Sequence, residues 1–143
     1  MVTVKVVETE QEKKLAFAVR EKVFVEEQGV PRHLELDEFD DNAIHFIVQS
    51  DDGNTIAAAR LREIETGVGK VERVSVLKEQ RGNHLGVLIM EFVEKYAKEH
   101  SWKKLKLNAQ VYAIPFYEKL GYVVTSPEFL DAYIPHRVME KDI

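Results

Sequence analysis

The chain has 143 residues, with 20 Lys and Arg against 25 Asp and Glu, a formal net charge of -5 and no cysteine. This length fits one domain spanning residues 1–143. The acidic balance argues against a nucleic-acid partner, and the lack of cysteine excludes disulfides, thiolate metal sites and a cysteine nucleophile. No apolar run approaches the roughly 20 residues of a membrane span. We therefore expect a cytoplasmic protein with no membrane partner.

The first half of the chain predicts a strand, a helix and a three-stranded meander. Alternating valines indicate the opening strand, and Thr9 with Glu12 forms a capping-box pattern that begins a helix. Turn-forming residues at 51–54 and 67–69 separate three later strands. The predicted elements are a strand at 2–6, a helix from 9 that fades near 26–29, an acidic irregular segment at 31–42, and strands at 43–49, 55–64 and 70–77.

The second half predicts two helices and three further strands. Apolar residues recur every three or four positions from Leu85 to Ala97, which is typical of an amphipathic helix. The predicted elements are a helix from about 82 to 100, a strand at 104–108, a helix at 114–120, and strands at 122–125 and 137–140. The order β-α-β-β-β-α-β-α-β-β predicts an α/β layout on a mixed sheet.

Several ligand motifs are excluded. Gly67–Lys70 resembles the end of a P-loop, but Ile64 replaces its first glycine and Val71 replaces the magnesium-binding Ser or Thr. The five histidines lack metal-ligand spacing, so no metal site is expected. The acidic residues 35–41 either form a solvated face or attract a cationic amine.

One segment has the chemistry of an anion site. A strand ending near Leu77 leads through a loop with Lys78, Arg81 and Gly82 into the longest predicted helix. The first amides of a helix are unpaired and carry partial positive charge, and glycine lets the backbone approach a phosphate. The alternative is an ordinary strand-to-helix turn with a surface arginine.

Two motifs in this order resemble the GNAT superfamily of N-acetyltransferases. Residues 76–86, with Arg81, Gly82 and Gly86, resemble its motif A, which binds the pyrophosphate of acetyl-CoA. Residues 108–122, with Phe116-Tyr117 followed by Gly121-Tyr122, resemble its motif B. Further similarity at 20–28, Asp37 and 134–136 indicates the YjcF/ElaA-like bacterial branch. The resemblance implies the GNAT (acyl-CoA N-acyltransferase) fold, an α/β (α+β) structure with a mixed, mostly antiparallel sheet of six to seven strands flanked by helices.

The resemblance also implies how acetyl-CoA binds as co-substrate. Asn108 would contact the pantetheine amides, its alternative role being a strand-end cap. His84 replaces the first motif glycine, so its side chain either crowds the pyrophosphate or donates to it. The residues implied in cofactor binding are Val74, Ser75, Val76, Arg81, Gly82, Asn83, His84, Leu85, Gly86, Asn108 and Tyr117.

Two residues are candidate catalysts. Strand alternation places Glu72, Val74 and Val76 on one face, with Arg73 and Ser75 on the other. Glu72 is the candidate base, the alternative being an ion pair with Arg60 or Arg62. Tyr117 matches the motif tyrosine that protonates the leaving thiolate, and its alternative is core packing beside Phe116.

The acceptor site is expected between the first helix, the loop that follows it and the C-terminal hairpin. Its candidate residues are Phe24, Glu27, Gln28, Tyr133 and His136. His136 is a second possible base. We expect an N-acetyltransferase acting on a primary amine, of a small molecule or a peptide, by direct attack in a ternary complex, because no acyl-cysteine can form. The alternatives are a non-catalytic acyl-CoA sensor and a protein-interaction domain. A homodimer is common in the family.

Overall fold

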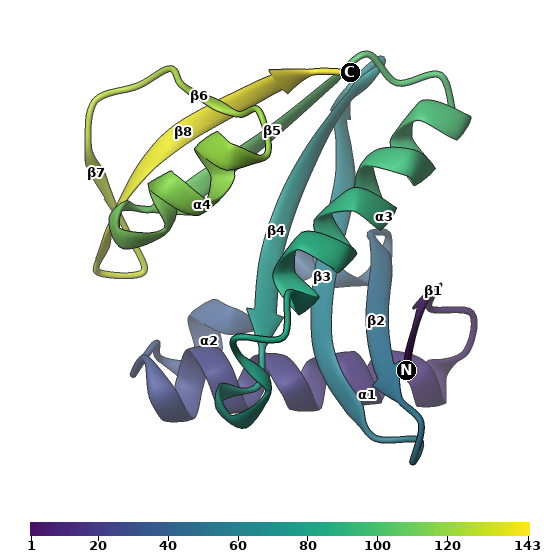
Figure 1. Cartoon of the computed structure of the whole chain (residues 1–143). Helices are drawn as coiled ribbons and strands as arrows, with labels where there is room; N and C mark the ends of the chain where they lie inside the picture. Colours follow the sequence, from purple (N-terminus) through teal and green to yellow (C-terminus); the bar gives the residue numbers. More distant parts are fainter.

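An eight-stranded mixed sheet carries the other elements of the chain, and the computed structural model describes all of residues 1–143 (Figure 1). The strands follow one another across the sheet in the order β1-β2-β3-β4-β5-β8-β6, and β7 pairs with β8. The strands are β1 (Val2–Val6), β2 (Ile44–Ser50), β3 (Thr55–Glu65), β4 (Val68–Val76), β5 (Lys104–Gln110), β6 (Val123–Val124), β7 (Phe129–Asp131) and β8 (Ile134–Asp142). All neighbouring pairs are antiparallel except β4 with β5.

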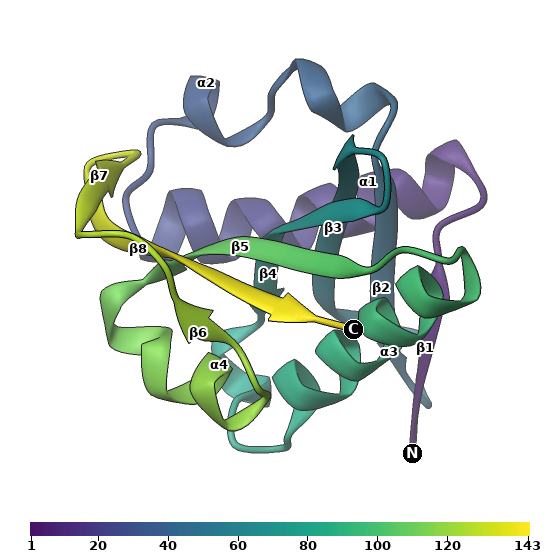
Figure 2. The same ribbon diagram turned by 90° about the horizontal axis from the view of Figure 1, so that it is seen from above.

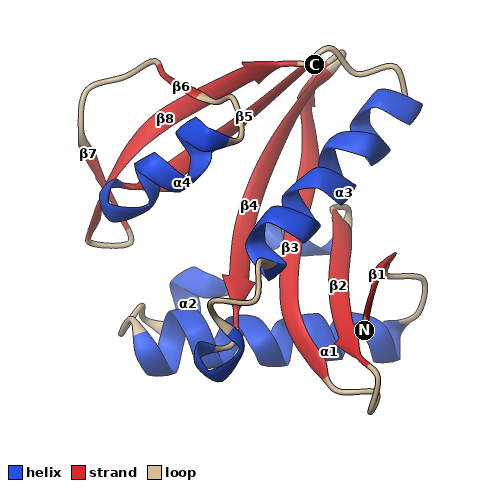
Figure 3. Ribbon diagram, in the orientation of Figure 1, coloured by secondary structure: helices blue, strands red, loops and turns tan.

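Helices cover both faces of the sheet (Figure 3). The α-helices are α1 (Glu10–Arg20), α2 (Arg32–Glu35), α3 (Leu85–Glu99) and α4 (Ile114–Lys119). A π-helical stretch η1 (Glu21–Glu27) continues α1, and 3-10 turns form η2 (Glu38–Asp41), η3 (Lys78–Gln80) and η4 (Val111–Ala113). As predicted, α1 begins at a Thr9 cap, whose hydroxyl accepts a hydrogen bond from the Glu12 amide at 3.1 Å. None of these helices is both long and apolar enough to cross a membrane.

Alternation along the central strands divides the core into two layers. Phe46 and Val48 of β2 face α3 and join the main core cluster of 17 buried residues. Between them, Ile47 faces the other way and packs with Ala16 and Val19 of α1. The sheet therefore separates α1 from α3 and α4 (Figure 2).

β4 and β5 run in parallel and pair only over a short stretch. Their register begins at Val68 with Lys104 and ends at Val71 with Leu107. Beyond Val71 the two strands diverge, and Figure 1 shows them opening as a wedge from the end near the C-terminus. The second half of β4 therefore has no strand partner on its β5 side.

The fold class predicted from sequence is confirmed, with corrections to its details. The sheet has eight strands rather than six to seven, because the three-residue β7 is too short to produce a periodic signal. The residues at 31–42 are not irregular, since they form α2 and η2. The strand expected at 137–140 is longer and starts at Ile134.

Candidate functional site

A cavity of about 710 Å³ lies where β4 and β5 diverge. Both diverging strands line it, through Val74 and Val76 on β4 and Asn108 on β5. Other lining side chains come from η1 and α2 on one face of the sheet and from α4 on the other. The cavity thus reaches both faces of the sheet through the gap between the two strands.

A β-bulge shapes the β4 edge of this cavity. Ser75 pairs with Ala58 and Glu72 pairs with Arg60, so two residues of β4 stand opposite one residue of β3. At the bulge, Arg73 has φ +56°, in the left-handed region. The predicted alternation is therefore wrong at this point. Glu72 and Ser75 lie on the α1 face with their β3 partners, whereas Val74 and Val76 pack against the main core.

The candidate base Glu72 is held in ion pairs. Its carboxylate accepts a hydrogen bond from Arg62 Nε at 2.6 Å, and it lies 3.1 Å from Arg60 Nη2 and 3.7 Å from Lys70 Nζ. Burial opposes ionisation, but the Arg62 hydrogen bond and the neighbouring positive charges outweigh it and hold the pKa of Glu72 below its usual value. The ion-pair alternative is confirmed, and a carboxylate held in this way is a weak proton acceptor.

His136 lines the cavity and is 8% exposed. Its Nδ1 donates to the carbonyl of Ile134 at 2.6 Å, and its ring stacks on Phe129 at 6.1 Å between centroids. Because a carbonyl only accepts, Nδ1 carries a proton, and in the neutral tautomer of this ring the lone pair lies on Nε2. Nε2 is therefore the nitrogen through which His136 would act as a general base.

Tyr117 on α4 and Asn108 on β5 both line the cavity. Burial raises the pKa of Tyr117, so its hydroxyl stays protonated. The ring also packs edge-on against Phe116 at 5.0 Å, so a core-packing role and a role at the cavity coexist. Asn108 pairs with Val138 inside β5, which continues to Gln110, and this excludes the strand-end cap.

The candidate anion loop folds back onto the end of β4. Arg81 donates from Nη2 and Nε to the Val76 carbonyl at 3.0 and 3.2 Å. Its Nη1 and Nη2 also donate to the Glu27 carboxylate at 2.5 and 2.6 Å, which lowers the pKa of Glu27. Glu27 was predicted to line the acceptor site, but it contacts this loop and not the cavity wall.

Backbone conformation explains the residue pattern of the loop. Gly82 has φ +88° and His84 has φ +60°, so the position where the motif has glycine needs a left-handed backbone. At Gly86, a Cβ would come within 3.0 Å of the Phe116 ring, so this glycine lets α3 approach α4. Leu85 is buried in the main core, and exposed Asn83 donates to the Gln80 carbonyl at 3.2 Å. Of the predicted loop residues, Arg81 and Gly86 line the cavity.

The predicted acceptor residues divide into two groups. Phe24 and Gln28 line the cavity beside His136, and the Gln28 side-chain oxygen accepts from Gln110 Nε2 at 2.9 Å. Gln110 was not predicted, because nothing in the sequence links it to Gln28. Tyr133 lies in the β7–β8 turn, is 76% exposed and does not line the cavity.

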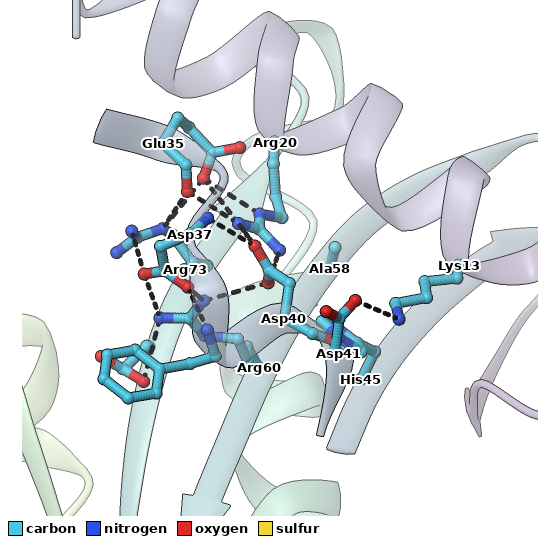
Figure 4. A network of polar contacts seen from close by, with 12 residues as sticks. Lys13, Arg20, Glu35, Asp37, Asp40, Asp41, His45, Ala58, Arg60 and Arg73 are labelled. Atoms are coloured by element: carbon cyan, nitrogen blue, oxygen red, sulfur yellow. Dashed lines mark hydrogen bonds and ion pairs between the residues drawn. The ribbon is translucent and has the colours of Figure 1, made fainter. Parts of the chain in front are cut away.

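A buried network of ion pairs, which we call the arginine network, occupies the α1 face beside the cavity (Figure 4). The solvated-face prediction is wrong for Glu35 and Asp40, which are 3% and 5% exposed. Arg20 donates to Glu35 at 2.8 Å and to Asp40 at 2.7 Å. The network consists of Arg20, Arg60 and Arg73 with Glu35, Asp37 and Asp40. Each of these carboxylates is paired with at least one arginine, and Arg60 also pairs with Glu72, so they do not form a free cation site.

Comparison with known proteins agrees with this geometry. Residues 6–143 match the Acetyltransferase (GNAT) domain family. The chain belongs to the GNAT family. YjcF of Bacillus subtilis (strain 168), named an uncharacterized N-acetyltransferase, is a 44% identical GNAT relative over 138 residues, which cover 96% of this chain and 97% of YjcF.

Solved structures share the GNAT fold. An acyl-CoA N-acyltransferase from Pseudomonas aeruginosa superimposes with a TM-score of 0.88 at 26% identity, covering 99% of both chains. Escherichia coli ElaA superimposes with a TM-score of 0.87 at 22% identity, again over 99% of both chains. The predicted GNAT membership in the YjcF/ElaA branch is confirmed, and acyl-CoA is the co-substrate of this acetyltransferase family. No three His, Asp or Glu side chains are grouped so that they could hold a metal ion.

Proposed function

We propose that this GNAT protein moves an acetyl group from acetyl-CoA to a primary amine by direct attack within a ternary complex. The observation that carries the proposal is the cavity at the divergence of β4 and β5, which reaches both faces of the sheet. A thioester entering from the α3–α4 face would meet an amine entering from the α1 face. Both reactants could then occupy the site together.

The β4 edge and the loop after it suit the parts of CoA. The Leu77 amide donates to Ile56 of β3 at 3.0 Å, so by alternation the Val76 amide and carbonyl face the gap. The carbonyl already accepts hydrogen bonds from Arg81, so the Val76 amide, with Asn108 across the gap, would bond the amide groups of the pantetheine. The loop from Arg81 to Gly86 and the unpaired amides at the start of α3 would bind the pyrophosphate.

Two side chains would carry the proton transfers. The His136 Nε2 lone pair accepts the proton of the incoming ammonium, directly or through water. The amine nitrogen then forms a bond to the thioester carbon while a β4 amide stabilises the charge developing on its oxygen. The carbon–sulfur bond breaks, and Tyr117 donates its hydroxyl proton to the departing thiolate. The extra proton on the former amine nitrogen then passes to the Tyr117 phenolate, directly or through water, which leaves a neutral amide and restores the tyrosine. We prefer His136 to Glu72 as the base because arginine holds the Glu72 carboxylate.

A non-catalytic acyl-CoA sensor of the same fold is the second candidate. The observation that favours it is the ion pairing of Glu72, which removes one of the two candidate bases from proton transfer. The sensor would bind acyl-CoA through the same β4 edge and loop. The two candidates differ only in whether an amine is acetylated.

Two measurements test these candidates. Stabilisation against thermal unfolding by acetyl-CoA, but not by ATP or NAD, supports the CoA site. Thiol release in the presence of amino acids, peptides, aminoglycosides and polyamines then separates the enzyme from the sensor. The protein contributes no thiol to this assay because it has no cysteine. Tight acetyl-CoA binding without release by any amine would favour the sensor.

Variants at the two proposed proton-transfer residues test their roles. We expect Tyr117→Phe and His136→Gln each to lower turnover at neutral pH about 100-fold, the effect typical of general acid–base groups. The loss of turnover in His136→Gln should become smaller as the pH rises, because the amine is then deprotonated in solution and needs no protein base. Wild-type turnover in either variant would remove that residue from the mechanism.

A further inference from the structure

Arg73 occupies an unusual backbone position for an arginine. Its φ of +56° lies in the left-handed region, which a residue with a Cβ adopts only when its surroundings impose it. It lies at the bulge, two residues after the last β4–β5 pair at Val71. The bulge therefore forms where β4 leaves β5 and where the cavity opens.

The side chain of Arg73 is held by four hydrogen bonds. Its Nε donates to the Glu35 carbonyl at 3.1 Å and to Glu35 Oε2 at 2.9 Å. Its Nη2 donates to the Leu34 carbonyl at 3.3 Å and to Asp37 Oδ2 at 3.2 Å. One guanidinium thus binds two backbone carbonyls and two carboxylates of the α2–η2 segment, and its planar fork fixes the direction of these bonds.

The acceptors of Arg73 are themselves fixed. Arg20 donates to the same Glu35 oxygen at 2.8 Å, and Arg60 donates to Asp37 at 2.6 Å (Figure 4). Arg20 and Arg60 are almost completely buried. The bulge is therefore tied through Arg73 to a rigid set of charges.

We propose that Arg73 is a positioning residue for acetyl transfer. By holding the bulge, it keeps the β4 amides that face the gap, such as that of Val76, aimed at the thioester oxygen. This inference rests on the proposed function, in which these amides stabilise charge on that oxygen. The α2–η2 segment lines the acceptor side of the cavity through Asp37. Through its bonds to Arg73, the same segment would also hold the acetyl-CoA side of the cavity in place.

The test compares Arg73→Gly, Arg73→Lys and a control, Arg32→Ala. Glycine adopts the bulge conformation without strain but has no guanidinium. Lysine keeps the charge and loses the fork, and it provides a second variant in case the glycine variant does not fold. Arg32 is an exposed arginine of α2 that pairs with Glu21 and does not line the cavity. Thermal unfolding establishes that each variant is folded.

The first readouts are kinetic. We expect Arg73→Gly to lower kcat about 100-fold, the cost of misplacing reacting groups by about 1 Å. Its dissociation constant for acetyl-CoA should stay within about threefold of wild type, because the pyrophosphate loop is intact. Ethylguanidinium added to this variant should restore part of kcat, and Arg73→Lys should fall between Arg73→Gly and wild type. Arg32→Ala should match wild type.

The second readout needs no acceptor. The carbonyl ¹³C resonance of [1-¹³C]acetyl-CoA should move downfield on binding to wild type and Arg32→Ala, and less on binding to Arg73→Gly. A shift in wild type without thiol release would reject the proposed enzyme, whereas a smaller shift in Arg73→Gly would still show that Arg73 positions the groups that bind the thioester. Equal shifts and equal kcat in wild type and Arg73→Gly would overturn the positioning role. No shift on binding to wild type would also overturn it.

Discussion

The two ends of the diverging half of β4 are both held by arginine, in opposite physical settings. At the bulge, Arg73 belongs to the arginine network, in which Arg20, Arg60, Glu35 and Asp40 are buried. At the C-terminal end, Arg81 binds the Val76 carbonyl and Glu27 on a partly exposed surface. Buried ion pairs are costly to break, with losses of about 3–5 kcal/mol when one partner is removed, whereas exposed pairs contribute about 0–1 kcal/mol.

This difference assigns the two ends different tasks. The network can fix a backbone shape because four of its six charges are buried and cannot be rehydrated without a large cost. Arg81 can exchange the Glu27 carboxylate for another anion at little cost, which suits the pyrophosphate-binding role proposed for it. The following predictions test this contrast, from the largest expected effect to the smallest.

Removing a carboxylate from the buried network should have the largest effect. Asp40→Ala deprives Arg20 and Arg60 of a shared partner, and we expect it to lower the free energy of unfolding by about 3–5 kcal/mol in urea titration. The neighbouring Asp41→Ala is the control, because its exposed side chain lies 3.9 Å from Lys13. It should cost less than about 0.5 kcal/mol. A similar small loss in both variants would show that the network is not rigid.

Acid should weaken the buried end of β4 first. Burial opposes ionisation of Asp37 and Asp40, but hydrogen bonds from Arg60 and Arg20 prevail and hold both pKa values below their usual range. The unfolded chain therefore binds more protons, so this stabilisation is complete above about pH 5 and is lost as the pH falls through the folded-state values. Urea midpoints measured from pH 7 to pH 2 should fall steeply below about pH 4. Urea midpoints that stay the same from pH 7 to pH 2 would show that the ionised Asp37 and Asp40 do not stabilise the fold.

The sequence predicted the regular elements well because each depends on neighbouring residues. The spacing of apolar residues from Leu85 to Ala97 reports directly on α3, whose bounds are Leu85–Glu99. The loop with Arg81 and Gly82 was found because its residues are adjacent. Tyr117 and Asn108 belong to the motif at residues 108–122, whose members are also close in sequence, and both line the cavity.

The bulge and the arginine network could not be predicted in the same way. Alternation assumes a regular pleat, so one inserted residue at Arg73 reverses the face of every residue beyond it. Arg20 and Glu35 are 15 residues apart, and Arg73 and Glu35 are 38 apart, so no local pattern links them. An acidic run such as 35–41 has the same composition whether it is solvated or buried against arginine.

At the exposed end of β4, releasing Arg81 should favour the ligand. Glu27→Gln removes the competing carboxylate, and we expect acetyl-CoA to bind about three- to fivefold more tightly by calorimetry. The gain should shrink in high salt, because exposed charges are screened. Glu26→Gln is the matched control on η1, since this exposed neighbour has no ion-pair partner. Weaker binding by Glu27→Gln would mean that the pair orients Arg81 toward the ligand.

An effect of similar size is expected at His84, where the loop meets α3. Its left-handed backbone disfavours any residue with a Cβ, so His84→Gly should be more stable than His84→Ala by about 1 kcal/mol in urea titration. The exposed imidazole also lies on the proposed pyrophosphate loop, so removing it should change the dissociation constant of acetyl-CoA. His84→Ala removes the same ring and separates this effect from that of the backbone. Equal stability of the two variants would mean that the loop relaxes to a negative φ at little cost. The conformation of the loop at the exposed end of β4 would then be determined by the bound ligand, whereas the conformation of the bulge is held by Arg73.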